Sequence, residues 1–239
     1  MKSSFSISIV SHGQGELIKK LIESLISKNF ISFDYEIIIT LNKEESTNFL
    51  KEFENLNIKV IKNKKEKGFA ENHNFAFIQS SKSFFIISNP DIEIVDFGSL
   101  FDESLDISEF ITCPLIFNKK GELEDNFRDF PTPFSLTLRK FGFDINHSSS
   151  TKFDWAAGMF LIIPRNLYEL LGGFDEKYFM YFEDVDLFYR SKQMGINYLC
   201  NHTIKVIHDA RRSSRKEIFY FLTHLRSAIR FFFKNKKII

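Results

Sequence analysis

The first 95 residues alternate between short apolar runs and helical patterns, and this alternation constrains the fold most strongly. Four runs predict strands: Phe5–Val10, Tyr35–Leu41, Asn57–Asn63 and the segment SFFIIS before Asn89. Helical patterns separate them, such as the stripe of Leu17, Leu21 and Leu25. This order predicts an α/β fold with an open, mostly parallel sheet and helices on both faces. Ligands bind such sheets beyond the carboxyl ends of the strands, which here are His12, Asn42, Asn63 and Asp91.

The second half of the chain has a different pattern. A strand is predicted at Phe110–Phe117, a loop-like stretch at Pro131–Ser150 and one further strand at Trp155–Pro164. The chain has 239 residues, is 44% apolar and contains no repeat or low-complexity linker. We therefore expect one continuous domain over 1–210, with halves of about 1–95 and 96–210, followed by a tail over 211–239.

Composition restricts the location and the chemistry of the protein. No run is apolar and long enough to cross a bilayer, and the first residues lack a signal-peptide pattern, so we expect the protein in the cytoplasm. Cys113 and Cys200 form no CxxC motif, which disfavours a zinc site or a disulfide framework and predicts two buried thiols. The 30 Phe residues are spread throughout and predict core filling.

The tail is strongly basic. From Arg211 to Lys237 there are nine Lys or Arg against Glu217 alone, a balance of +8, so the rest of the chain has −7 within the total of +1. A helical apolar stripe of Ile218, Leu222, Leu225, Ile229 and Phe232 lies beside a basic row of Arg226, Arg230 and Lys234. This helix suits an anionic membrane surface or a lipid diphosphate, with the end FFFKNKK on lipid. It equally suits docking on the body by its apolar face with solvated cations.

A cluster of acids precedes a helical pattern in the second half. Gly172 and Gly173 end the helix predicted for RNLYELL, and Glu183-Asp184 begin the next one. Asp186 can pair with Arg190 four residues on. Asp184 shares a face with apolar residues, where a carboxylate either caps the helix or takes part in chemistry. The local pattern leaves both interpretations open.

Two other segments contain candidate ligand contacts. Asn89-Pro90-Asp91 follows an apolar strand, where Asp91 could bind Mg²⁺ or Mn²⁺, although an ordinary turn is the commoner origin of this sequence. His208 ends the strand pattern TIKVIH and precedes possible metal and phosphate contacts at Asp209, Arg211 and Arg212. The segment from Gly68 to Asn74 places backbone amides at a helix start, but matches neither a P-loop nor GxGxxG.

Six segments together resemble family-2 glycosyltransferases, in this order along nearly the whole chain: IVSHG, GFAENHNFA, ISNPDIEI, DWAAGMFLIIPR, GGFDEKYFMYFEDVDLFYR and VIH. The resemblance is closest to bacterial rhamnosyltransferases of O-antigen and other cell-surface polysaccharide assembly. It implies a single-domain, Rossmann-like nucleotide-sugar transferase fold of the GT-A type. It also implies one inverting, metal-dependent sugar transfer.

The resemblance assigns roles to individual residues. Asp184 matches the catalytic base, and Asp91 and His208 match the site for Mg²⁺ or Mn²⁺. The positions near the nucleotide are Ser11, His12, Asn42, Gly68, Asn72 and Asn89. Those of the sugar and acceptor cleft are Trp155, Ala157, Gly158 and Glu183, with Arg211 and Arg212 as phosphate or lipid contacts. Asn89 and Asn42 stand where the family usually has acids.

The expected function is transfer of a sugar, rhamnose from dTDP-rhamnose, to a lipid-linked saccharide in cell-surface polysaccharide biosynthesis. We expect a cytoplasmic protein bound peripherally to the inner membrane, with no nucleic-acid partner. A non-catalytic, nucleotide-sugar-binding scaffold of a membrane assembly complex is the alternative, which has no need of Asp91, Asp184 and His208 together. A nucleotidyltransferase would need a basic loop after the first strand, and SHGQGE contains no Lys or Arg.

Overall fold

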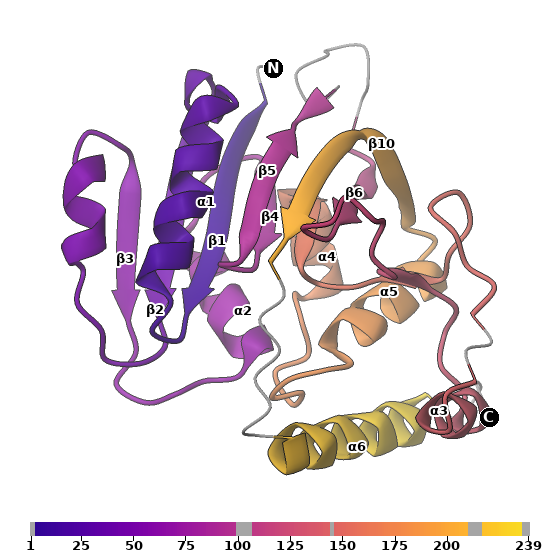
Figure 1. Cartoon of the computed structure of the whole chain (residues 1–239). Coiled ribbons are helices and arrows are strands. Elements are labelled where there is room, and N and C mark those ends of the chain that lie inside the picture. The colour runs from indigo at the N-terminus through magenta and orange to yellow at the C-terminus, as the bar shows by residue number, and fades with distance from the viewer. Residues whose placement is uncertain (1–2, 99–106, 144–145, 210–216, 236–239) are drawn as a thin grey trace.

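The computed structural model describes residues 3–98, 107–143, 146–209 and 217–235 (Figure 1). An eight-stranded sheet has the order β3-β2-β1-β4-β9-β6-β10-β5, and β7 and β8 form a separate pair. The strands are β1 Ser4–Ser11, β2 Asp34–Leu41, β3 Ile58–Lys62, β4 Phe84–Ser88, β5 Ile92–Asp96, β6 Phe110–Phe117, β7 Phe127–Arg128, β8 Trp155–Ala156, β9 Phe160–Pro164 and β10 Asn197–His208. The α-helices are α1 Gly15–Ser27, α2 Phe69–Gln79, α3 Pro133–Lys140, α4 Arg165–Leu171, α5 Glu183–Gln193 and α6 Glu217–Lys234, with 3-10 helices η1 Phe30–Ser32 and η2 Asn48–Phe53.

The first four strands form the parallel half of the sheet. β1 pairs in parallel with both β2 and β4, and β2 pairs in parallel with β3. Parallel neighbours need crossover connections, which α1 and α2 provide on opposite faces. β9 then enters antiparallel between β4 and β6, and β5 lies antiparallel to β10 at the edge. The predicted α/β fold with a mixed, mostly parallel sheet and helices on both faces is confirmed.

Strand alternation divides the core between the two faces of the sheet. In β4, Ile86 faces the layer that contains α1, whereas Phe85 and Ile87 face the layer that contains α2, α4 and α5. β9 alternates in the same way. Because both faces are covered, these strands are nearly continuous apolar runs, which is why the sequence pattern identified them.

The second half corrects two sequence expectations. The single strand expected at Trp155–Pro164 is two strands, β8 and β9, because the chain turns at residues 157–159 between two different sheets. The stretch Pro131–Ser150, expected as loop, contains α3. Thr132 caps this helix by accepting a hydrogen bond from the Ser135 backbone N–H, and Pro133 stands at its first turn.

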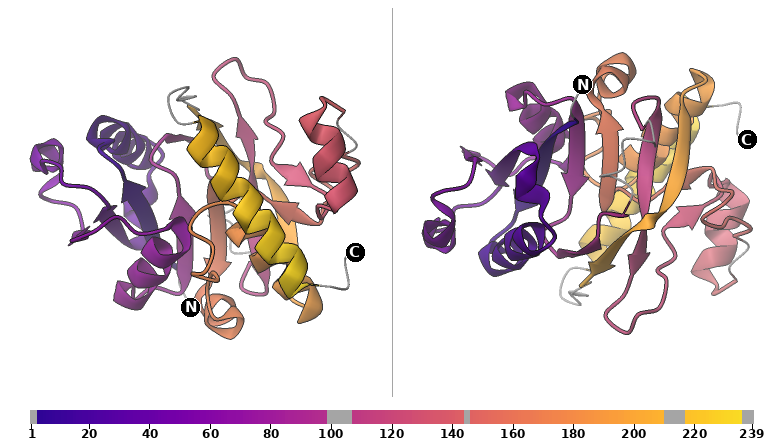
Figure 2. Two further views of the ribbon diagram at one scale, coloured as in Figure 1. Left: turned by 90° about the horizontal axis from the view of Figure 1, so that it is seen from below. Right: turned by 90° about the horizontal axis from the view of Figure 1, so that it is seen from above.

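The predicted C-terminal helix is present as α6, but it docks on the body by a different face from the one expected. Its buried side chains are Ser227, Ala228 and Phe231. The apolar stripe faces solvent instead, with exposures of 78% at Ile218, 56% at Leu222, 44% at Leu225 and 48% at Ile229. Phe231, part of the end expected on lipid, is fully buried. Figure 2 shows α6 crossing the lower side of the molecule near α3.

The cations of α6 are not merely solvated, because two of them bind acids of the body, the buried Asp186 and the partly buried Asp175. The Lys234 Nζ lies 2.7 Å from Asp186 Oδ1 and 2.8 Å from Asp175 Oδ2, and Arg230 also reaches Asp175 at 3.3 Å. Asp186 is fully buried and accepts from Arg190, as the sequence predicted, at 2.7 Å. A buried carboxylate is costly unless it is paired. Lys234 therefore fixes α6 to the first turn of α5.

None of the helices in the described residues is both long and apolar enough to span a membrane.

Replacing Lys234 by Met is expected to lower the free energy of unfolding by about 1–3 kcal/mol, because Asp186 then keeps Arg190 as its remaining cationic partner. Urea denaturation of the purified variant checks this value. Arg226→Met is the matched control, since Arg226 lies on the exposed side of α6. Equal stability losses in the two variants would contradict a specific role for the Lys234–Asp186 pair.

Candidate active site

The start of α5 is held in an unusual backbone conformation. Tyr181 and Phe182 immediately precede the helix with φ values of 68° and 67°. The left-handed region is strained for bulky residues and persists only where the surroundings impose it. Such strain gathers at functional sites. Here it turns the chain so that Glu183 and Asp184 begin the helix together.

Asp184 is held by two backbone donors. The Gly158 N–H donates to Asp184 Oδ2 at 3.0 Å, and the Val185 N–H donates to Oδ1 at 2.8 Å. Burial raises the pKa of the Asp184 carboxyl above its ordinary value, and these hydrogen bonds oppose the rise. The N-cap residue of α5 is Phe182, so Asp184 does not hold the capping position, although it contacts the Val185 N–H in the first turn. Its carboxylate also lines a cavity, as a chemical role requires.

Glu183 differs from its neighbour. Burial raises its pKa well above the ordinary value, and the charge of Asp184 raises it further. Its Oε2 is buried and has no hydrogen-bond partner among the described residues. Adjacent carboxyl groups with different surroundings divide into one acid and one base. The pKa of Glu183 is raised more strongly than that of Asp184, because Glu183 is buried without the two backbone N–H donors that Asp184 has.

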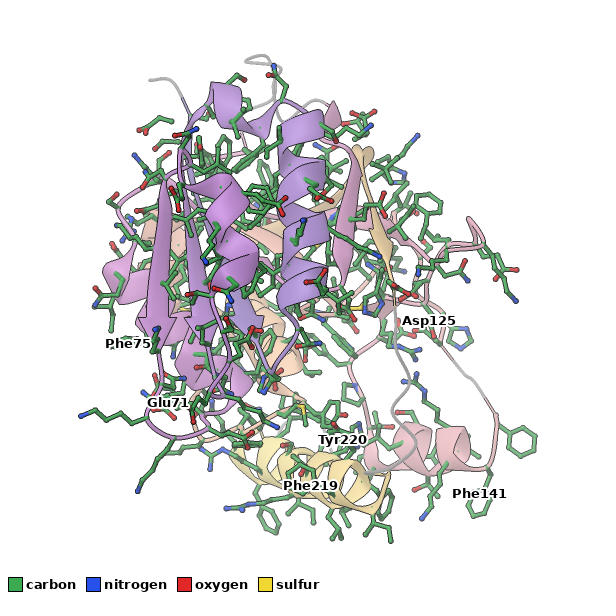
Figure 3. All side chains as sticks on the ribbon, turned by 60° about the vertical axis from the view of Figure 1, so that its left-hand side comes forward. Glu71, Phe75, Asp125, Phe141, Phe219 and Tyr220 are labelled. Atoms are coloured by element: carbon green, nitrogen blue, oxygen red, sulfur yellow. The ribbon has the colours of Figure 1, made fainter. Side chains whose placement is uncertain are left out.

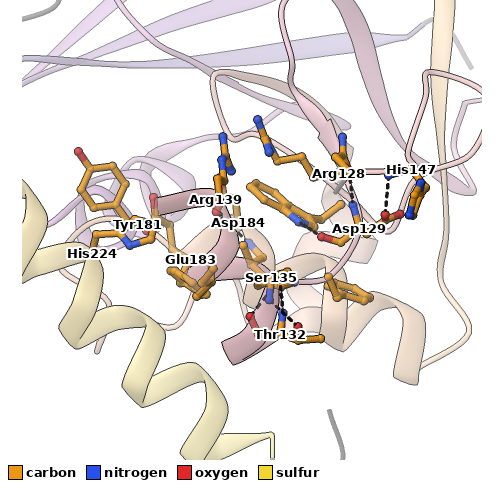
Figure 4. A pocket seen from close by; sticks show the side chains of 17 residues that line it. Arg128, Asp129, Thr132, Ser135, Arg139, His147, Tyr181, Glu183, Asp184 and His224 are labelled. Atoms are coloured by element: carbon orange, nitrogen blue, oxygen red, sulfur yellow. Dashed lines mark hydrogen bonds between the residues drawn. The ribbon is translucent and has the colours of Figure 1, made fainter. Parts of the chain in front are cut away.

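A cavity of about 340 Å³ opens beside this pair (Figure 4). Aromatic residues Phe130, Trp155, Tyr181 and Phe182 line it, and the Trp155 Nε1–H donates to the Asp129 carbonyl at 2.9 Å. Of the residues predicted for the acceptor cleft, Trp155 and Glu183 line the cavity. Ala157 and Gly158 do not; Gly158 acts behind it by holding Asp184.

Asp91 and His208 lie side by side, although 117 positions separate them in a chain of 239 residues. The His208 Nε2 is 3.4 Å from Asp91 Oδ2, and its Nδ1 is 2.9 Å from Glu124 Oε2. Burial disfavours the charged imidazole, but hydrogen bonds and charges from Asp91 and Glu124 outweigh it and raise the pKa of His208 to about 9. Sequence reasoning missed Glu124, which lies in an ordinary-looking turn after β6.

These residues fit a divalent cation. Asp91 Oδ1 is buried without a hydrogen-bond partner in the described structure. Glu124 can hold the Nδ1–H of His208 and leave Nε2 for a metal, the usual carboxylate–histidine arrangement. No group of three or more potential ligand side chains is assembled for a metal within the described ranges. Mg²⁺ and Mn²⁺ commonly take only one or two protein carboxylates and complete their shell with phosphate and water.

The backbone of residues 158 and 159 connects the two acidic sites. The Asn89 N–H, in the Asn-Pro-Asp turn, donates to the Met159 carbonyl at 2.8 Å, and the adjacent Gly158 N–H binds Asp184. Asp91 and His208 themselves do not line the cavity beside Asp184. The structure thus brings the predicted residues together as two neighbouring groups on one edge of the sheet.

A second carboxylate that the sequence did not indicate lies after β2. Glu45 Oε2 accepts from the Ser11 hydroxyl and from the Gly13 N–H, both at 2.6 Å. The loops after β2 and β3 border a hollow of about 580 Å³ that includes Asn42 and Glu45. Asn42 follows β2 at the position where the family usually has an acid. In this chain a carboxylate, that of Glu45, lies three residues later. His12 is exposed nearby.

The predicted nucleotide residues Asn42 and Asn72 have protein partners for their amides. Asn42 Oδ1 accepts from the Lys67 N–H at 2.9 Å, and Asn72 Nδ2 donates to the Gly68 carbonyl at 2.9 Å. A Cβ on Gly68 would lie 2.6 Å from the Phe179 carbonyl oxygen, which explains a glycine here by close backbone packing. These residues shape the loop before α2, and their contact with a nucleotide stays a prediction.

Arg211 and Arg212, predicted as phosphate or lipid contacts, lie outside the described residues.

Asn126 is a further residue that the sequence patterns did not indicate. Its side chain is 1% exposed and neither amide atom has a partner in the described structure. Its carbonyl accepts from the Ala157 N–H at 2.9 Å, which places it between Glu124 and the segment that holds Asp184.

Comparisons with known proteins agree with this geometry. The model of the family "Glycosyl transferase family 2" matches residues 6–186. The chain is 29% identical to the rhamnosyltransferase WbbL of Escherichia coli (strain K12) over 255 residues, which cover 96% of this chain and 93% of that protein. It is 36% identical over 63 residues to an N-acetylglucosaminyl-diphospho-decaprenol L-rhamnosyltransferase of Mycobacterium tuberculosis (strain CDC 1551 / Oshkosh), covering 26% of this chain and 20% of that protein.

Solved structures share the fold. GalNAc-T7 with UDP, GalNAc and Mn²⁺ superposes with a TM-score of 0.67 at 17% identity, covering 89% of this chain and 44% of that chain. The mannosyltransferase PcManGT from Pyrobaculum calidifontis with GDP-Man and Mn²⁺ superposes with a TM-score of 0.63 at 12% identity, covering 96% of this chain and 65% of that chain. This chain therefore spans only part of these solved chains. The likeness confirms the predicted GT-A type fold.

We expect Asp91→Asn and His208→Ala each to weaken Mn²⁺-dependent binding of a nucleoside diphosphate. Glu124→Gln should weaken it about 10-fold or more, because the ligand histidine loses its orienting partner. Calorimetric titration of UDP and of dTDP with and without Mn²⁺ measures this.

Asp96→Asn, at the far end of β5, is the matched control for the metal titration. Unchanged titrations for Asp91→Asn and His208→Ala would remove the metal assignment.

Proposed function

This chain belongs to glycosyltransferase family 2, and from that membership we propose that it transfers rhamnose from dTDP-rhamnose to a lipid-linked saccharide. The names of its relatives support the choice of sugar, since WbbL and the mycobacterial protein are both rhamnosyltransferases. The mycobacterial name also specifies a diphospho-decaprenol-linked acceptor. We place the reaction in cell-surface polysaccharide biosynthesis.

The arrangement of Asp184 is the observation on which the proposal rests most. The carboxylate lines the cavity, is oriented by Gly158 and Val185, and lies beside the buried Glu183, whose pKa is raised well above its ordinary value. An acceptor hydroxyl in the cavity gives its proton to Asp184 as its oxygen bonds to the anomeric carbon. The bond from that carbon to the diphosphate breaks, and the nucleoside diphosphate leaves with the electron pair. One displacement inverts the anomeric configuration.

Asp91 and His208 would hold the divalent cation near the donor. Bound there, Mg²⁺ or Mn²⁺ neutralises charge that develops on the departing diphosphate. Glu124 keeps the His208 ring in position. The backbone link from Asn89 through Met159 and Gly158 sets the spacing between this group and the base.

Replacing Asp184 by Asn should lower kcat by about 10²–10⁴-fold, because the amide keeps the shape of the side chain but cannot take a proton. The assay is transfer from dTDP-rhamnose to a diphosphate-linked N-acetylglucosamine acceptor, with the anomeric product configuration read by NMR. Wild-type kcat should fall with decreasing pH at a point above the ordinary Asp value of about 3.9, because the base pKa is raised.

Glu183→Gln provides the comparison for Asp184→Asn. Since Glu183 is neutral in our interpretation, its amide should cost less than 10-fold in kcat. Full turnover in Asp184→Asn, or an equal loss in both variants, would remove Asp184 as the base.

We also propose peripheral attachment to the inner face of the cytoplasmic membrane. The solvent-facing stripe of α6 supports this, since an exposed row of large apolar side chains on a helix marks an interaction surface. Figure 3 shows Phe219 of α6 and Phe141 after α3 at the same lower edge of the molecule. The nine basic residues between 211 and 237 suit an anionic lipid surface.

The double substitution Leu222→Ser and Ile229→Ser should reduce binding to phosphatidylglycerol-containing vesicles about 10-fold, because both side chains leave water when α6 lies in the interface. Sedimentation with vesicles measures the bound fraction, which should also fall as salt rises. Ile78→Ser, a 72% exposed position on α2, is the control. Equal effects of Ile78→Ser and the double substitution would argue against docking by α6.

A further inference from the structure

The cavity beside Asp184 has a buried floor and an exposed rim. Glu183 and Val185 at its floor are buried, whereas Arg139, His147 and His224 are exposed. Arg139 comes from the last turn of α3 and His224 from the middle of α6 (Figure 4). The rim therefore lies where two helices that the sequence left unconnected approach each other.

Arg139 is the rim cation available to a ligand. Arg128, also in the lining, pairs with Asp125. Within the described ranges, Arg139 has no carboxylate partner. The His224 ring packs against Tyr181 and Phe182, with ring centres 5.4 and 5.2 Å apart. Its pKa is lowered by partial burial of the ring and then by the Arg139 charge.

The diphosphate of the donor is not the expected ligand of the Arg139 guanidinium. The residues that fit its metal, Asp91 and His208, are absent from the lining of the cavity. A cation beside the acceptor cavity therefore faces a separate anionic group. Guanidinium groups bind phosphate oxygens in pairs of parallel hydrogen bonds, which makes phosphate a well-matched partner.

Exposed apolar side chains continue outward from the rim on both helices. Phe134 of α3 is 69% exposed and Phe141, which ends α3, is 72% exposed. On α6, Phe221 is 47% and Leu225 44% exposed. The Lys140 Nζ lies 4.7 Å from the centre of the Phe221 ring, which places the end of α3 beside α6. The cavity with aromatic walls, the Arg139 guanidinium and these exposed apolar side chains thus occur together at α3 and α6.

We propose that the rim between α3 and α6 is a diphosphate-binding site for the acceptor, with Arg139 as its principal contact. The proposal rests on the proposed function and deepens it by naming how the acceptor is recognised. The saccharide lies in the cavity with its hydroxyl toward Asp184, the diphosphate binds Arg139, and the hydrocarbon chain lies along Phe134, Phe141 and the exposed face of α6. A diphosphate is the one group that such an acceptor has between sugar and lipid.

A binding measurement tests the site without sugar transfer. Geranyl diphosphate and geraniol are titrated into the full chain in EDTA, so that no divalent cation bridges phosphate to the donor site. Arg139→Gln should weaken geranyl diphosphate binding about 10- to 100-fold, as expected for a lost charge-assisted contact, and leave geraniol unchanged. Lys140→Gln, the neighbouring cation on α3, is the matched control and should stay within about 2-fold.

A transfer measurement separates this proposal from the proposed function. Wild type and Arg139→Gln are compared on N-acetylglucosamine linked to a short alkyl chain either through diphosphate or directly as a glycoside. Arg139→Gln should raise KM about 10-fold or more for the diphosphate acceptor alone, with kcat at saturation retained. The variants Arg139→Gln and Lys140→Gln should both melt at the wild-type temperature, since Arg139 and Lys140 are exposed.

The outcomes are distinct. Equal geranyl diphosphate affinity in wild type and Arg139→Gln, or equal losses in Arg139→Gln and Lys140→Gln, would overturn the site. So would equal KM increases for both acceptors, which would indicate a general effect on the cavity. Absence of transfer by the wild type to either acceptor, with Arg139-dependent binding intact, would count against the proposed function while the diphosphate site stands.

Discussion

The buried carboxylate of Asp186 is the constraint on which the second half of the structure depends. It lies in the first turn of α5 without exposure to water, so it requires cations from elsewhere in the fold. Arg190 provides one and also donates to the Leu171 and Gly173 carbonyls at the end of α4, at 2.5 and 2.8 Å. Lys234 provides the other from the end of α6. One carboxylate thereby fixes three helices relative to one another, two residues after the proposed base.

This arrangement lets one short segment serve two purposes. Asp186 faces the interior and orders the helices, while Asp184 lines the cavity beside the buried Glu183, whose pKa is raised well above its ordinary value. The strained backbone at Tyr181 and Phe182 can persist because the helix behind it is held at its first turn. The proposed base therefore lies on a rigid element, which is what proton transfer at a fixed distance requires.

The insertion of β9 antiparallel between β4 and β6 connects the two acidic sites. It brings residues 158 and 159 against both the Asn-Pro-Asp turn and the start of α5. The proposed metal residues and the proposed base then occupy adjacent positions at one edge of the sheet, while α3 and α6 border the cavity beside the base.

The sequence by itself determined the parallel half of the sheet, α2, α4 and α5, and the pairing of Asp186 with Arg190, because buried strands, glycine helix ends and spacings of four are local patterns. Likeness to a family singled out Asp91, Asp184 and His208. Only the tertiary structure decided that Glu124 holds His208, that Glu45 binds Ser11, and that Arg139 and His224 share a rim. These contacts join residues tens of positions apart, so no local period encodes them. The docking face of α6 was likewise decided only in the tertiary structure, because Ala228 and Phe231 pack in an apolar cluster on the body and Lys234 pairs with Asp175 and Asp186, all partners distant in the sequence.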